Sequence, residues 1–102
     1  MKKLLILLTF LVAGGANAAE VTSATIDKYN QKCAMCHNGN VPGAPKSHDV
    51  AAWEQRLATA GSMEALVASA VKGKGAMPPK GMCFDCTNGD FEALIAYMSA
   101  AE

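Results

Sequence analysis

Two cysteines and a histidine form the strongest chemical signature in the sequence, in the motif Cys33-Ala34-Met35-Cys36-His37. Residues three positions apart share one face of a helix, so both thiols can face the same flat ligand. Each thiol can add to one vinyl group of a porphyrin, and the following imidazole can bind the porphyrin iron. This spacing is the attachment signature of a c-type haem. The motif therefore predicts one covalent haem c held by Cys33 and Cys36, with His37 as an axial iron ligand.

The second axial ligand has several candidates, which are His48, Met63, Met77, Met82 and Met98. Met77 is favoured because flexible glycines precede it and Pro78 and Pro79 follow it, and prolines restrict the backbone of a loop. A thioether ligand favours reduced iron and raises its reduction potential, and a filled sixth position suits electron transfer. Met82 is a weaker competitor. Met63 and Met98 have the spacing of helix core residues, and His48 is expected at the surface.

Four short helices and no convincing strand are predicted, so the expected fold class is all-α. Apolar residues at helical spacing and capping residues place these helices at about 22–36, 49–61, 62–72 and beyond 88. The segments between them, 38–48 and 73–87, are rich in glycine and proline and are predicted to be loops. His37 thus lies directly before the first of these loops, and Met77 lies within the second.

The first 18 residues carry the pattern of a secretory signal peptide. A short positive start at 1–3 precedes an apolar run at 4–12, and 16–18 has the small-x-small pattern of a cleavage site. The apolar run is too short to span a membrane, although a retained anchor is the alternative. Cleavage would leave 19–102 as one monohaem domain exported to the periplasm, where its cysteines should be oxidised or otherwise chemically committed.

Nine basic and nine acidic residues balance in the full sequence. Loss of Lys2 and Lys3 with the leader makes the domain slightly acidic, which excludes a basic nucleic-acid binder. Four lysines are nevertheless expected around the haem edge, namely Lys46, Lys72, Lys74 and Lys80. Such a positive rim could steer docking to an acidic redox partner, although ordinary solvated lysines would show the same pattern.

The sequence resembles class I cytochromes c, and more narrowly the cytochrome c5 family of gamma-proteobacteria. The resemblance is carried by His37 after the cysteine pair, by Met77-Pro78, and by the stretches 43–46, 73–81 and 83–86 in this order. It covers nearly all of the expected mature chain. It implies a monohaem electron carrier, which together with the leader pattern predicts a periplasmic one-electron carrier without a small-molecule substrate. The expected state is a monomer or a weak dimer, because an exposed haem edge could self-associate. Its partners would be membrane respiratory complexes such as a quinol-oxidising complex and a terminal oxidase or reductase.

Several residues near the motif could support the haem. The resemblance implies that a proline carbonyl accepts a hydrogen bond from the axial imidazole, and Pro45 is the best match, with Pro42 as an alternative. Trp53 could donate its indole N–H to a haem propionate or fill the core. Arg56 could pair with a propionate or remain a solvated charge. The aromatic residues expected where the first and last helices cross are Tyr29 and Tyr97.

The second cysteine pair, Cys83 and Cys86, has no following histidine and is not a second haem site. The resemblance implies that the pair forms a small disulfide, and a redox-active dithiol is the alternative. Two further functions remain open. One is an open-site haem sensor or small peroxidase, in which Met77 would not bind the iron. The other is a structural zinc module in which both cysteine pairs would bind the metal.

Overall fold

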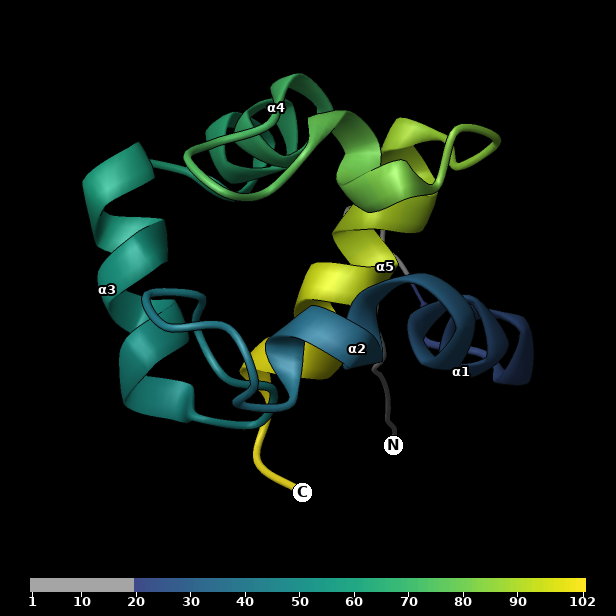
Figure 1. Ribbon diagram of the computed structural model, residues 1–102, viewed down its shortest axis with the longest axis horizontal. Coiled ribbons are helices and arrows are strands. Elements are labelled where there is room, and N and C mark those ends of the chain that lie inside the picture. Colours follow the sequence, from purple (N-terminus) through teal and green to yellow (C-terminus); the bar gives the residue numbers. More distant parts are fainter. Residues whose placement is uncertain (1–19) are drawn as a thin grey trace, which may run out of the picture.

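The computed structural model describes residues 20–102, which form helices joined by loops (Figure 1). The expected leader and its cleavage site lie outside these residues. The elements follow one another as α1 (Ser23–Lys28), η2 (Tyr29–Cys33), α2 (Ala34–His37), α3 (Val50–Ala60), α4 (Met63–Lys72), η3 (Pro79–Met82) and α5 (Asn88–Ser99). Over the described range the β-type pairing is limited to one isolated bridge, between Lys74 and Met77. The predicted all-α class is confirmed.

Side-chain caps begin the helices close to the predicted positions. The Asp49 carboxylate accepts the N–H of Ala52 at 3.2 Å at the start of α3. Thr87 and Asp90 form a reciprocal capping box at the start of α5, with bonds of 3.1 and 2.9 Å. Such caps satisfy amide groups that have no partner within the helix. Because they are local, they could be recognised in the sequence alone.

The first helical segment differs from the single regular helix predicted for 22–36. Its middle part, η2, is π-helical, and the N–H of Ala34 donates to the carbonyl of Tyr29, five residues earlier. A π-turn contains more residues than an α-turn and therefore rotates the residues that follow it relative to those that precede it. This rotation sets which way the segment 33–37 faces. The amphipathic pattern of the sequence contained no signal for it.

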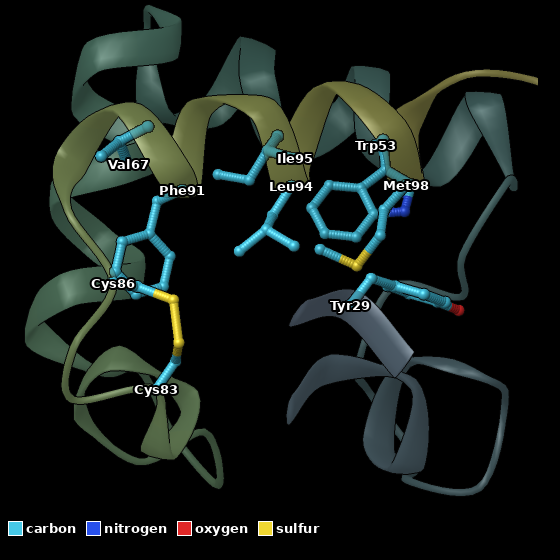
Figure 2. Packing of buried hydrophobic residues seen from close by; sticks show 9 residues of the cluster. All are labelled: Tyr29, Trp53, Val67, Cys83, Cys86, Phe91, Leu94, Ile95 and Met98. Atoms are coloured by element: carbon cyan, nitrogen blue, oxygen red, sulfur yellow. A yellow bond between two sulfur atoms is a disulfide. The ribbon is translucent and has the colours of Figure 1, made fainter. Parts of the chain in front are cut away.

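Helix α5 contributes the largest share of the core. Phe91, Leu94, Ile95 and Met98 are all buried, as their spacing predicted. Figure 2 shows how these side chains form one cluster with residues of other elements. The disulfide lies beside Phe91 at one end of the cluster, while aromatic side chains lie near Met98 at the other. The other cluster members are Tyr29, Trp53, Val67, Cys83 and Cys86.

Helix α3 buries less than its pattern predicted. Trp53 is buried, but Val50 and Leu57, which share one side of the helix with it by their spacing, are 38% and 37% exposed. Both border a shallow apolar pocket between α3, α4 and α5. Trp53 is thus the residue of α3 that joins the buried core cluster, while Val50 and Leu57 face this pocket.

The first and last helical segments cross at two tyrosines, as predicted. The rings of Tyr29 and Tyr97 meet edge to face, with centroids 5.0 Å apart and an interplanar angle of 65°. The Tyr29 hydroxyl donates to the Ser47 hydroxyl at 2.7 Å, so the crossing also holds the loop after α2. None of the helices in the described part of the chain is long and apolar enough to cross a membrane.

Candidate functional site

The predicted attachment cysteines lie where η2 meets α2, and both carry free thiols. Cys33 is partly buried and Cys36 is exposed. Burial, with a smaller contribution from the charge of Cys36, raises the pKa of Cys33 to about 11, because the thiolate is disfavoured away from water. Near neutral pH Cys33 is therefore a protonated thiol. The two cysteines remain unpaired although the other pair, with the same spacing, is oxidised.

His37 is buried, with 9% of its surface exposed, and its ring is held from one side. Its Nδ1 lies 2.7 Å from the carbonyl oxygen of Pro45. Since a carbonyl can only accept, Nδ1 carries a proton and donates it, so in the neutral imidazole the lone pair lies on Nε2. This is the arrangement of a neutral histidine that binds a metal through Nε2. Of the two candidate prolines, the structure brings Pro45 to the imidazole and not Pro42.

The loop that carries Pro45 is held by side chains of α3. The indole N–H of Trp53 donates to the carbonyl of Lys46 at 2.9 Å, and its ring lies 5.5 Å from the His37 ring between centroids. The indole has a single N–H, so this bond argues against donation to a propionate and for the core alternative. Arg56 donates to the Gly43 carbonyl at 2.6 Å and is therefore not simply a solvated charge.

Met77 lies in a tight loop that joins α4 to η3. Two backbone hydrogen bonds, of 3.0 and 2.9 Å, join it to Lys74. Gly73 has a φ of +92°, and a Cβ there would lie 2.9 Å from the backbone nitrogen of Pro79, so the loop can close only over a glycine. The Met77 side chain is half-buried, and its terminal methyl carbon packs over Gly81.

The remaining ligand candidates have other surroundings. Met98 is buried in the core and Met63 packs against it, as predicted for both. Met82 is 55% exposed. The Nδ1 atom of His48 lies 2.8 Å from the Ala100 carbonyl, so this histidine contacts the end of the chain rather than an iron site.

The second cysteine pair forms a disulfide whose residues are almost fully buried. A zinc site built from both pairs needs four thiolates, and the disulfide removes two of them. The loop also engages Lys80, whose ammonium group lies 3.5 Å from the Phe84 carbonyl and 3.3 Å from that of Cys86. Lys80 was expected on the docking rim, and the structure adds that its ammonium group contacts these two backbone carbonyls while the residue stays partly exposed. No local sequence pattern indicates these contacts, because the two carbonyls belong to the backbone of the loop that the disulfide closes.

The other three lysines of the expected rim are exposed, and they are Lys46, Lys72 and Lys74. Their exposure is compatible with a docking role. It is equally what solvated lysines show.

Comparisons with known proteins show which family this chain belongs to. The family model described as "Cytochrome C oxidase, cbb3-type, subunit III" matches residues 23–98. A cytochrome c5 of Ectopseudomonas mendocina is 40% identical over 86 residues, covering 84% of this chain and 92% of the relative. A solved mono-haem ferrocytochrome c from Shewanella putrefaciens is 49% identical over 76% of this chain and 94% of its own, with a TM-score of 0.64. A cytochrome c solved in an electron transfer complex with nitrite reductase is 38% identical, with a TM-score of 0.67, over 78% of this chain and 95% of its own.

A small helical fold built around a Cys-x-x-Cys-His motif defines a haem-binding electron-transfer protein. This chain belongs to the cytochrome c family, and its relatives include proteins named cytochrome c5. It is therefore a monohaem electron carrier rather than an enzyme, with one covalent haem c as its cofactor.

The residues present fit that cofactor. The cysteines of the attachment motif are free, and the imidazole beside them keeps one nitrogen available because the other donates to Pro45. These are the groups that thioether formation and iron binding require.

Proposed function

We propose that this protein is a periplasmic one-electron carrier that shuttles electrons between respiratory complexes, such as a quinol-oxidising complex and a terminal oxidase or reductase. The leader pattern at 1–18 supports export, and membership of the cytochrome c family supports the redox role. The observation that carries the proposal is the orientation of His37. Its hydrogen bond to Pro45 leaves Nε2 free next to two unpaired cysteines.

In this proposal Cys33 and Cys36 hold the haem through thioether bonds, and His37 Nε2 and Met77 Sδ bind the iron. The haem supplies an iron that changes between the ferrous and ferric states. Pro45 holds the imidazole ring, and the Gly73–Met77 turn holds the thioether. Because both ligands are held by packed loops, little has to move when an electron arrives or leaves.

The proposed partners are redox proteins that dock transiently near the haem edge. The exposed lysines Lys46, Lys72 and Lys74 would provide a positive rim for an acidic partner. The similar cytochrome c solved in an electron transfer complex with nitrite reductase supports a reductase as one class of redox partner. Neither nucleic acid nor a small-molecule substrate belongs to this function.

Denaturation of the purified protein tests covalent attachment. The protein is produced in cells competent in cytochrome maturation and boiled in denaturant, and the polypeptide is then separated. We expect the red colour and the mass of one haem to stay with the polypeptide. A colourless polypeptide of bare mass would refute the attachment to Cys33 and Cys36.

Absorption spectra test the axial ligands. We expect the ferric protein to show the weak long-wavelength band of a methionine–iron bond, and the ferrous protein to bind carbon monoxide poorly. An open site would lack the band and bind carbon monoxide readily, which would favour the sensor or peroxidase alternative.

A further inference from the structure

Three consecutive residues behind the Met77 loop have left-handed backbone conformations. Lys80, Gly81 and Met82 have φ values of +61°, +55° and +70°. Only Gly81 adopts such values without a steric penalty, because the other two carry a Cβ. Strained non-glycine residues of this kind persist only where surrounding contacts hold them. Such contacts should therefore be found around Lys80 or Met82.

The contacts are made by Lys80. Its ammonium group lies 3.5 Å from the Phe84 carbonyl oxygen and 3.3 Å from that of Cys86, and both atoms can accept its N–H groups. Its own carbonyl accepts the N–H of Cys83 at 2.8 Å. Lys80 is thus tied to the disulfide loop by its side chain and its backbone. Met82 is 55% exposed and has no comparable anchor among the hydrogen bonds of residues 20–102.

The same strained segment supports Met77. The terminal methyl carbon of Met77 lies 3.2 Å from the point where a Cβ on Gly81 would stand, so the methionine packs directly over this glycine. The Gly81 N–H also donates to the Pro78 carbonyl at 2.9 Å, which fixes the distance between the two sides of the loop. A shift of Lys80 would therefore move the surface on which the Met77 side chain rests.

We propose that Lys80 is a positioning residue for Met77, and that its ammonium group holds the Lys80–Met82 segment in the conformation that presents the thioether. The inference rests on the proposed function, in which Met77 binds the iron. A lysine suits this position because an ammonium group has three donors and can serve two carbonyls together. Hydrogen bonds from a charged donor are also stronger than neutral ones. Lys80 then acts on the ligand and not on a docking partner.

The test compares Lys80→Gln and Lys80→Arg with the wild-type haem protein and with Lys28→Gln. The control residue Lys28 lies in α1, outside the candidate haem site and the proposed docking rim. The rate at which carbon monoxide binds to the ferrous protein measures how often Met77 leaves the iron. We expect Lys80→Gln to raise this rate roughly tenfold, since it loses charged hydrogen bonds. We expect Lys80→Arg to restore most of the wild-type rate, and Lys28→Gln to leave it unchanged.

Hydrogen exchange separates positioning from a general loss of stability. In Lys80→Gln the amides of Gly81 and Cys83 should exchange faster, while buried amides of α5 keep wild-type rates. Equal carbon monoxide rates in Lys80→Gln and wild type would overturn the inference, and so would uniformly faster exchange throughout α5. A wild-type protein without the methionine–iron band would instead overturn the proposed function, so the two failures are distinguishable.

Discussion

Single contacts at the residue scale decide what the site can do. The Pro45 carbonyl determines which nitrogen of His37 carries its proton, and the other nitrogen is then available to a metal. Gly73 and Gly81 act differently, because the absence of a side chain lets backbone and thioether approach closely. The hydrogen bond to Pro45 therefore orients the His37 side of the site, and the close contacts at Gly73 and Gly81 shape the Met77 side.

Met77→Ala tests the axial thioether directly. Removal of the soft ligand should lower the reduction potential by roughly 100 mV or more, since axial ligands set potential over a wide range. The variant should also bind carbon monoxide rapidly in the ferrous state. Redox titration and flash or mixing kinetics measure both effects. Met82→Ala is the matched control, because Met82 lies in the same loop but is exposed, and it should behave as wild type. Equal potentials in Met77→Ala and wild type would contradict the ligand assignment.

Trp53→Phe tests the role of the indole. The substitution keeps most of the ring packing but removes the N–H that donates to Lys46. Loss of this bond leaves a carbonyl without its partner and should cost about 1–2 kcal/mol of unfolding free energy, measured by denaturant titration. The reduction potential should change little, because the N–H is engaged by backbone. A large shift in potential with unchanged stability would favour the propionate alternative.

At the scale of elements, two irregular turns orient the ligands. The π-turn η2 rotates the attachment motif relative to α1, and η3 with its left-handed residues links the Met77 loop to the disulfide. Neither turn is specified by hydrophobic periodicity. The regular helices α3, α4 and α5 are, in contrast, bounded by caps that the sequence displays. The regular helices α3, α4 and α5 thus form the scaffold, and the irregular turns η2 and η3 orient the candidate haem ligands.

The double variant Cys83→Ser with Cys86→Ser tests what the disulfide contributes. The closed loop is short, so loop entropy predicts a loss of about 2 kcal/mol in unfolding free energy. We expect a red protein that unfolds at lower denaturant concentration. Reduction of the wild-type disulfide under mild conditions serves as the control and should approach the same midpoint. Complete loss of haem from the double variant would mean that the two cysteine pairs had been assigned to the wrong roles.

At the scale of the whole molecule, α5 is the element on which the others assemble. Figure 1 shows it at the centre, with α3, α4 and the first helical segment around it. The aromatic pair of Tyr29 and Tyr97 closes this arrangement at one end, and the disulfide beside Phe91 closes it at the other. The frame therefore brings η2, which precedes the His37 segment, into contact with η3, which follows the Met77 loop, although the two elements are distant in the sequence.

Salt dependence of electron transfer tests the proposed docking rim. If exposed lysines steer a negatively charged partner, the second-order rate should fall as ionic strength rises. We expect Lys74→Gln to lower the rate a few-fold at low salt and to weaken its salt dependence, as measured by stopped-flow mixing with the redox partner. Lys74→Arg keeps the charge and should match the wild type. A wild-type rate that does not change with ionic strength would contradict the proposal that these lysines steer docking.

The sequence by itself determined the attachment motif, the preference for Met77 and the starts of the regular helices, because each depends on residues a few positions apart. The family resemblance already favoured Pro45 as the partner of His37, and the structure chose it over Pro42. The tertiary structure alone decided that the Trp53 indole donates to the Lys46 carbonyl and that the Lys80 ammonium contacts the Cys86 carbonyl. These contacts join a side chain to a carbonyl in a loop. Every residue has the same backbone carbonyl, so the sequence does not indicate which carbonyl a side-chain donor will contact. The folded path of the backbone determines it.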